Sequence, residues 1–367
     1  MGTPNGRKHR VGVIGTSWWA DLEHLPGLKA RGDVELPALC GRDERRLNAL
    51  ADKYAIPARH TDWRKLVEGS GLDVVVLSTP NHLHHPQALL ALDRGLHVIC
   101  EKPLTLDLAQ ARELAERART ADRRTLTFFS YRTVGAAEHV KRLVADGWLG
   151  QVHHVTARYL TASHLQPGKP AQWRMKRAEA GTGVLGDLGS HLIDLVRWWL
   201  GDFGRVSAQW QTLTRERRGE AVDADESVSF LADLACGAQA SFHASKLVAG
   251  QGNWVGIELH GSAGSLVFEA DTGFTVGWAG RLRGAKADRL GLEVIPLPAD
   301  LSPRLEGTVD RTGRDEAYRR LTDPFFASLS GGPAATPDFA DGAAVQAVLD
   351  AVAASAESGR WVDVERV

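Results

Sequence analysis

Short apolar runs and amphipathic runs alternate along the first third of the chain. The apolar runs are rich in Val, Leu and Ile and predict buried strands at 10–15, 34–40, 72–79, 95–100 and 124–129. Helical spacing of apolar residues predicts helices between them, at 19–31, 43–54, 62–69, 82–94 and 107–121. Strands that alternate with helices in this way form βαβ units, in which helices cover both faces of a parallel sheet. The pattern predicts a doubly wound α/β domain over residues 1–129.

The pattern changes after residue 130. Helical spacing at 138–150 is followed by an expected edge strand at 151–162, a Gly- and Lys-rich loop at 164–183 and a helix at 188–200. Strand-like segments joined by short turns then follow, near 204–214, 226–234, 237–246, 254–260 and 264–270. They predict an α+β domain with an open, mostly antiparallel sheet over residues 130–335. The apolar segment within 336–367 predicts a C-terminal helix that packs back on the first domain.

Composition excludes several classes of partner. The 367-residue chain has a formal net charge of −1 and 43% hydrophobic residues, so no overall charge attracts it to nucleic acid or to an anionic membrane. No apolar run approaches the roughly 18–20 residues of a membrane-spanning helix, and the first residues do not resemble a signal peptide. We therefore expect a cytoplasmic protein whose partner is a small molecule. Its three cysteines, Cys40, Cys100 and Cys236, are expected to be reduced thiols in the core.

The first expected strand ends in the segment GVIGTSWWA, which fits most of the dinucleotide fingerprint G-x-G-x-x-G/A. Gly15 suits the tight turn, Ser17 replaces the second glycine, and Ala20 permits close packing of the following helix. The N-terminus of that helix attracts phosphate, so the segment predicts a dinucleotide site. The expected cofactor contacts here are Gly15, Thr16, Ser17, Trp18 and Trp19.

The end of the second expected strand bears on which cofactor binds. A fold that prefers NAD usually carries an acid at this point for the ribose 2′-hydroxyl, whereas this chain has Gly41 followed by Arg42. A guanidinium can bind a 2′-phosphate through two charge-assisted hydrogen bonds, so Arg42 favours NADP, with NAD as the alternative. Two other interpretations stay open: Arg42 is a solvated residue before the helix, or Asp43 binds the ribose after a shift of one residue.

Several further motifs resemble those of the glucose–fructose oxidoreductase / inositol dehydrogenase / MocA family. Residues 79–84 contain T-P-N-x-x-H, residues 101–103 are E-K-P, and residues 186–194 contain G-D-x-G-x-H-x-x-D. Four further segments resemble landmarks of the family and occur in the family's order: SYR, WLGQV, QWR and LHGSAGSLVFE. The resemblance covers essentially the whole chain. It implies a Rossmann domain followed by an α+β domain, a nicotinamide-dependent oxidoreductase that acts on a sugar, cyclitol or related polyol, and a homodimer or homotetramer.

The resemblance also implies catalytic roles for Lys102, Asp187 and His191. Lys102 follows the carboxyl end of a strand, where ligands of an α/β sheet bind, and its ammonium can donate to a substrate oxygen as charge shifts. Asp187 and His191 are spaced to share one helical face, with Asp194 one turn further along. Histidine titrates near neutrality, so His191 suits proton transfer. Alternatively, Asp187 is a helix N-cap and His191 is a core histidine.

The remaining expected contacts lie in the family's loops. Further cofactor contacts are expected at Thr79, Pro80, Asn81, His84 and Glu101, and the substrate is expected to meet Tyr131, Trp173 and Arg174. No metal is expected, because the histidines at 82–85 and 153–154 lack carboxylates or thiols at ligand spacing. Two other activities stay open for such a chain. One is a glycosidase that retains its nicotinamide for transient oxidation, and the other is a regulator that senses a dinucleotide without catalysis.

Overall fold

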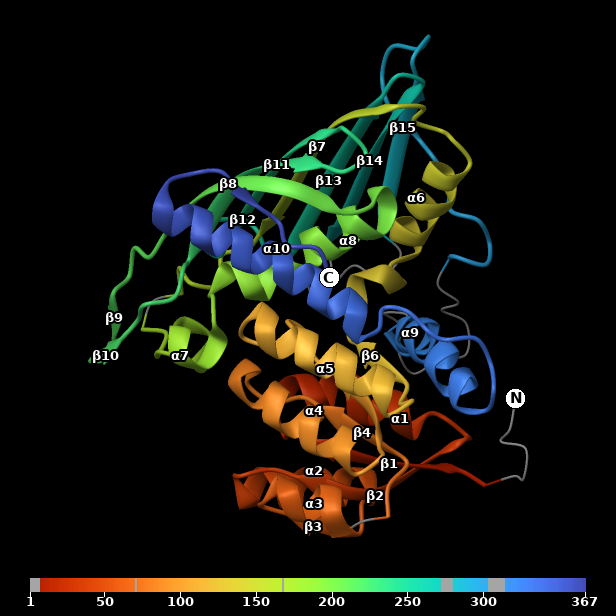
Figure 1. Ribbon diagram of the computed structural model, residues 1–367, viewed down its shortest axis with the longest axis vertical. Helices are drawn as coiled ribbons and strands as arrows, with labels where there is room; N and C mark the ends of the chain where they lie inside the picture. Colours follow the sequence, from red (N-terminus) through yellow and green to blue (C-terminus); the bar gives the residue numbers. More distant parts are fainter. Residues whose placement is uncertain (1–6, 70, 167, 272–279, 303–313) are drawn as a thin grey trace. The chain divides into compact units, whose positions relative to one another are not determined.

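The computed structural model describes residues 7–69, 71–166, 168–271, 280–302 and 314–367 (Figure 1). The chain forms two compact units, one of residues 1–129 with 315–343 and the other of residues 130–314 with 344–367. The C-terminal part of the chain thus contributes to both units. The predicted limits 130–335 and 336–367 divide that part differently and stay predictions.

The first unit is built on a six-stranded parallel sheet with the order β3-β2-β1-β4-β5-β6. The predicted doubly wound parallel sheet is confirmed. Sequence patterning missed β3, because Ala-Arg-His carries no apolar run. The strands are β1 His9–Ile14, β2 Val34–Cys40, β3 Ala58–His60, β4 Val74–Leu77, β5 His97–Cys100 and β6 Thr125–Thr127.

Helices cover both faces of this sheet. In β4, Val74 and Val76 join one hydrophobic cluster with residues of α1, α2 and α9, whereas Val75 and Leu77 join a second cluster with residues of α3, α4 and α5. Burial of alternate residues on opposite faces explains why the strands read as continuous apolar runs. The helical segments are η1 Ala20–His24, α1 Leu25–Lys29, α2 Glu44–Tyr54, α3 Trp63–Gly69, η2 Asn81–Leu83, α4 His84–Asp93, α5 Leu108–Thr120 and α9 Arg314–Leu329.

The second unit contains a nine-stranded sheet with the order β16-β15-β14-β13-β7-β12-β11-β8-β17. Its pairs are antiparallel except for β7 with β12, which agrees with the predicted mostly antiparallel sheet. The strands are β7 Val152–Leu160, β8 Phe203–Gln211, β11 Ser227–Leu234, β12 Gln239–Ser245, β13 Trp254–Gly261, β14 Gly264–Asp271, β15 Arg281–Lys286, β16 Glu293–Val294 and β17 Val362–Asp363. A separate ribbon pairs β9 Glu216–Arg217 with β10 Glu220–Ala221.

The predicted edge position of β7 is wrong, because β7 lies between β13 and β12. Its polar start, with exposed His153 and His154, resembles an edge strand in sequence. A strand inside a sheet can also expose every second side chain when one face of the sheet meets solvent. From His154 to Leu160 the more exposed side chains alternate with buried ones, so one-sided exposure, and not a free edge, explains this part of the pattern.

Helices of the second unit include α6 and α8, which contact strands of the large sheet and each other (Figure 1). The helical segments of this unit are η3 Ser130–Thr133, α6 Gly135–Ala145, η4 Trp173–Met175, α7 Arg177–Ala180, η5 Leu185–Gly189 and α8 Ser190–Leu200.

The three cysteines were all predicted to be core thiols, and this is wrong for one of them. Cys40 and Cys100 are buried, but Cys236 is exposed at the turn between β11 and β12.

The last helix, α10 Phe339–Ser358, corrects the expectation that no apolar run approaches the length of a membrane-spanning helix. It is long and apolar enough in composition to cross a membrane, with a mean hydropathy of 1.2 over its best window. However, 61% of that window is buried inside the protein. Phe339 and Ala343 belong to a core cluster of the first unit, and the Ser355 hydroxyl accepts a hydrogen bond from the backbone N–H of Ala208 in the second. The apolar, Ala-rich composition of α10 therefore reflects packing within the protein.

Candidate active site

In the first unit, the turns after three neighbouring strands meet at one edge of the sheet. β1 pairs with β2 on one side and with β4 on the other. Beyond the paired residues, the N–H of Gly15 donates to the carbonyl of Cys40 at 2.9 Å, and the N–H of Ser78 donates to that of Ile14 at 2.8 Å. In open α/β sheets, ligands bind outside this carboxyl edge where the strand order reverses. The fingerprint turn after β1 occupies that position.

Gly15 is required by the geometry of this turn. Its φ is +128°, and a Cβ added to it would lie 2.1 Å from the carbonyl oxygen of Ser78. The next fingerprint position, Ser17, accepts a hydrogen bond from the N–H of Ala20 at 3.2 Å, so its hydroxyl caps the helical turn that follows. Trp18 is 54% exposed and open to a ligand.

The structure explains why no acid stands at the end of β2. A Cβ on Gly41 would lie 2.4 Å from Cγ2 and 2.6 Å from Oγ1 of Thr16, so a carboxylate there would collide with the fingerprint turn. The next residue, Arg42, is exposed. The carboxylate of Asp43 instead caps α2 by accepting from the N–H of Arg46 at 3.1 Å. Arg42 is thus the basic group at the end of β2, and Asp43 has a helix-capping role.

Glu101 joins the fingerprint segment to the loop that carries Lys102. Its Oε1 accepts from Nε1 of Trp19 at 2.6 Å and lies 2.9 Å from Nε2 of His24. Burial alone would raise the pKa of Glu101, but His24, Lys102 and the Trp19 hydrogen bond outweigh it and lower the pKa. The carboxylate therefore stays charged inside the protein and ties two candidate cofactor loops together.

His84 fixes the same loop from the other side. Its ring is fully buried, with Nδ1 3.0 Å from the carbonyl oxygen of Pro103 and Nε2 2.9 Å from that of Thr79. Burial lowers the pKa of His84. The ring thus links the loop after β4, which carries Thr79, Pro80 and Asn81, to the loop after β5. Lys102 is half-buried. The residues on both sides of it are held in place, Glu101 by Trp19 and His24 and Pro103 by His84.

In the second unit, Asp187 is oriented by two cations. It lies in η5, just before α8, and its carboxylate is 2.6 Å from Nζ of Lys246 and 3.4 Å from Nε of Arg174. The guanidinium of Arg174 also stacks 4.3 Å above the ring of Trp173. These contacts are ion pairs with side chains, so the alternative of a helix N-cap does not describe the Asp187 carboxylate.

His191 lies in the first turn of α8, one helical turn after Asp187. Its buried ring meets that of Tyr131 with 4.8 Å between centroids, and the Tyr131 hydroxyl donates to that of Tyr159 at 2.9 Å. Tyr131 is only 3% exposed, and it packs between His191 and the hydroxyl of Tyr159. Of the predicted substrate wall, Trp173 and Arg174 are partly exposed.

The polar face of α8 does not continue to Asp194 as expected. Asp194 is 1% exposed, and its carboxylate forms an internal ion pair with Arg132, with 2.6 Å between NH2 and Oδ1. Helical spacing placed Asp194 correctly on the helix but could not indicate the guanidinium that covers it. Asp194 therefore belongs to the interior of the second unit.

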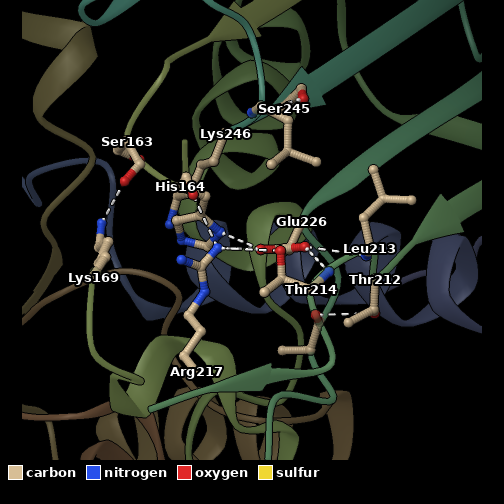
Figure 2. Close-up of polar contacts among 12 residues, drawn as sticks. Ser163, His164, Lys169, Thr212, Leu213, Thr214, Arg217, Glu226, Ser245 and Lys246 are labelled. Carbon is tan, nitrogen blue, oxygen red and sulfur yellow. Dashed lines mark hydrogen bonds and ion pairs between the residues drawn. The ribbon is translucent and has the colours of Figure 1, made fainter. Parts of the chain in front are cut away.

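Sequence reasoning missed the charged groups that support Asp187. Lys246 follows β12 directly and is buried, and its backbone N–H donates to the carbonyl of Glu226 at 3.1 Å. The Glu226 carboxylate accepts from the backbone N–H groups of residues 213 and 214, and it pairs with His164 at 3.0 Å and Arg217 at 2.9 Å (Figure 2). No motif marks these residues. A lysine at or just past the end of an apolar strand, as at Lys102, is the one signal the sequence carries.

We expect Glu226→Gln to destabilise the protein most near neutral pH. Burial alone would raise the pKa of Glu226, but His164, the Thr214 N–H and Arg217 lower it to about 2. A lowered pKa stabilises the fold above the usual range of glutamate, and this contribution is lost as the pH falls toward the folded-state value. Removing one partner of a buried ion pair costs about 3–5 kcal/mol. Urea unfolding should show that loss near neutrality and a smaller loss at about pH 4.

Glu216→Gln is the matched control for this prediction, because Glu216 is exposed on β9. It should change the free energy of unfolding little at either pH. An equal loss for Glu226→Gln at both pH values would contradict a role for the carboxylate charge.

Both units resemble domains of known proteins. Residues 9–129 match the GFO/IDH/MocA model described as an oxidoreductase family with an NAD-binding Rossmann fold, and residues 137–267 match the GFO/IDH/MocA C-terminal domain. The chain is 29% identical to levoglucosan dehydrogenase of Pseudarthrobacter phenanthrenivorans, over 86% of each chain. It is 28% identical to D-xylose 1-dehydrogenase (NADP(+)) 2 of Haloferax volcanii, over 96% of this chain and 99% of that one. A solved structure of levoglucosan dehydrogenase in complex with NADH matches with a TM-score of 0.88 and 27% identity, over 98% of this chain and 100% of the other.

Proposed function

Because the chain belongs to the GFO/IDH/MocA family of oxidoreductases, we propose that it moves hydride between NADP and a hydroxyl- or carbonyl-bearing carbon of a sugar, cyclitol or related polyol. Relatives named for dehydrogenation of levoglucosan and D-xylose support this substrate class. The observation that carries the proposal is the Asp187 carboxylate held by two cations one helical turn before His191. Such a set has a use in proton transfer and none in cofactor binding alone.

The residues of the first unit fit a nicotinamide dinucleotide. The side-chain-free turn at Gly15, the exposed Trp18 and Arg42, and the loop after β4 lie at or just past the carboxyl ends of the strands. We propose that Gly15, Thr16, Ser17, Trp18, Trp19, Arg42, Thr79, Pro80 and Asn81 hold the cofactor. Glu101 and His84 act through the loops that they fix. When bound, the nicotinamide supplies the hydride acceptor or donor.

The chain's own contribution is to move a proton and to stabilise charge on the substrate oxygen. In the oxidative direction, His191 takes the proton of the substrate hydroxyl as the carbon becomes a carbonyl, and it returns this proton in the reductive direction. Asp187, which pairs with Lys246 and Arg174, stabilises the imidazolium that forms. Lys102 donates a hydrogen bond to the same substrate oxygen, where negative charge develops. Trp173 and Arg174 bind the rest of the sugar.

The proposal is tested by a panel of aldoses, polyols and cyclitols, assayed for reduced-nicotinamide absorbance with NAD and with NADP. Lys102→Met serves as the blank. Turnover that disappears in the blank supports the dehydrogenase activity. Silence over the whole panel, together with a nicotinamide that copurifies and returns to its starting oxidation state, would instead favour a glycosidase that uses it transiently.

The preference for NADP rests on Arg42. We expect Arg42→Ala to lower the ratio of kcat/KM for NADP to that for NAD by about 10- to 100-fold, the worth of a charge-assisted contact with a 2′-phosphate. Arg45→Ala removes an exposed arginine from the same segment and should leave the ratio unchanged. An unchanged ratio in Arg42→Ala would show that the preference lies elsewhere.

Association and location are proposed by resemblance. We propose a cytoplasmic homodimer or homotetramer that binds its sugar as a single small-molecule partner. Light scattering coupled to size-exclusion chromatography, over a range of protein concentrations, tests the oligomeric state. A monomer at every concentration would contradict the proposed homodimer or homotetramer.

A further inference from the structure

A second lysine lies in the charged surroundings of Asp187. Lys169 belongs to the loop after β7, and its Nζ donates to the backbone carbonyl of Ser163 at 2.8 Å (Figure 2). The charged groups Lys246, Arg217, Asp187 and Arg174 all act on it electrostatically. The residue after Ser163, His164, donates its backbone N–H to the carbonyl of Lys246 at 3.0 Å, and Lys246 pairs with Asp187 at 2.6 Å, so hydrogen bonds link Lys169 to the carboxylate proposed to assist catalysis.

The carboxylates near Lys169 are already matched to other cations. Asp187 pairs with Lys246 and Arg174, and Glu226 pairs with Arg217. The buried carboxylate of Asp225 accepts hydrogen bonds from the backbone N–H groups of residues 183 and 185. Among the residues that the structure describes, none offers Lys169 a carboxylate within ion-pair distance. Its hydrogen-bond acceptor there is a neutral carbonyl.

The ammonium is consequently disfavoured in the free protein. Burial lowers the pKa of Lys169, and the neighbouring cations Lys246 and Arg217 lower it further, against the opposing effect of Asp187. His164 lies in the same cluster, and burial lowers its pKa as well. A half-buried positive charge without an anion is costly unless a ligand supplies one.

We infer that Lys169 binds an anionic group on the substrate, a carboxylate or a phosphate ester, so that the preferred substrate is an acidic sugar. This inference rests on the proposed function, because it concerns the substrate of the same site. The hydroxyls of a neutral sugar can also accept a hydrogen bond from Lys169, but they cannot offset its charge. An anion can, through a charge-assisted hydrogen bond about twice as strong as a neutral one.

Matched substrates that differ in one group test the inference. We would measure kcat/KM for glucose, glucuronate and glucose 6-phosphate, and for galactose and galacturonate, in the wild type, Lys169→Met and Lys169→Arg. The wild type should prefer an acidic member, and Lys169→Met should lower the acid-to-neutral ratio by about 10- to 100-fold. Lys169→Arg should restore much of the ratio. The glucuronate and glucose 6-phosphate arms distinguish a carboxylate from a phosphate.

Lys176→Met is the control, because Lys176 lies a few residues along the same loop region and pairs with Glu220. It should leave the acid-to-neutral ratio unchanged. Equal loss for acidic and neutral sugars in Lys169→Met, or a wild type that prefers the neutral members, would overturn the inference.

A binding measurement separates this inference from the proposed function. Calorimetric titration of glucuronate and glucose into wild type and Lys169→Met needs no turnover. If no sugar is oxidised or reduced but glucuronate binds in a Lys169-dependent way, the proposed function fails and the anion site stands. If sugars turn over but glucuronate binds no better than glucose, the proposed function stands and the anion site fails.

Discussion

Lys102→Met is expected to lower kcat by about 10²–10⁴-fold while the protein keeps its affinity for the reduced cofactor. Glu101 and His84 fix the backbone on either side of Lys102, so the substitution should remove the ammonium without moving the loop. Methionine keeps most of the length of the side chain and removes its charge and its hydrogen-bond donors. Steady-state turnover gives kcat, and quenching of tryptophan fluorescence gives the affinity for the cofactor.

The control for this substitution is Lys65→Met. Lys65 is exposed on α3 in the same unit, and its loss should change neither kcat nor cofactor affinity. A Lys102→Met enzyme that turns over as fast as the wild type would remove Lys102 from the catalytic set. A variant that has lost cofactor binding as well would instead assign Lys102 to the cofactor site.

Gly15→Ala is expected to destabilise the first unit by about 2–5 kcal/mol and to weaken cofactor binding. The added Cβ would lie 2.1 Å from the Ser78 carbonyl oxygen, and alanine rarely adopts a φ of +128°. The clash is with backbone, so relieving it must separate the turns after β1 and β4. Urea unfolding measures the loss of stability, and titration with reduced cofactor measures the loss of affinity.

Gly32→Ala is the matched control for Gly15→Ala. Gly32 is exposed in the segment between α1 and β2, and a Cβ added there has no neighbour within 4 Å. It should unfold and bind cofactor like the wild type. If Gly15→Ala does the same, the close approach of the two turns is not required for the cofactor site.

The strands of the first unit could be predicted because both faces of its sheet are covered. Val74–Leu77 is buried along its whole length, and a short run of β-branched and apolar residues between turns is typical of a central parallel strand. The half-buried strands of the second unit gave a weaker signal. β7 carries exposed polar residues on one face, and its sequence cannot tell that face from a sheet edge.

The candidate site was predicted where a short motif carries it and missed where contacts join distant segments. Lys102, Asp187 and His191 lie in contiguous motifs. By contrast, the ion pair of Lys246 with Asp187 spans 59 residues and that of Glu101 with His24 spans 77. Such pairs depend on which strand ends and loops the fold brings together. Helical periodicity likewise placed Asp194 beside His191 without indicating the Arg132 guanidinium that pairs with it.

The most direct test of the account follows one hydrogen atom. The best substrate of the sugar panel would be labelled with deuterium at the carbon that becomes a carbonyl, and NMR would locate the label after turnover with NADP. We predict one deuterium on the nicotinamide ring for each NADPH formed, with an equal amount of keto or lactone product. A product without net NADPH formation, or NADPH without the label, would contradict hydride transfer from a sugar carbon as the reaction of this enzyme.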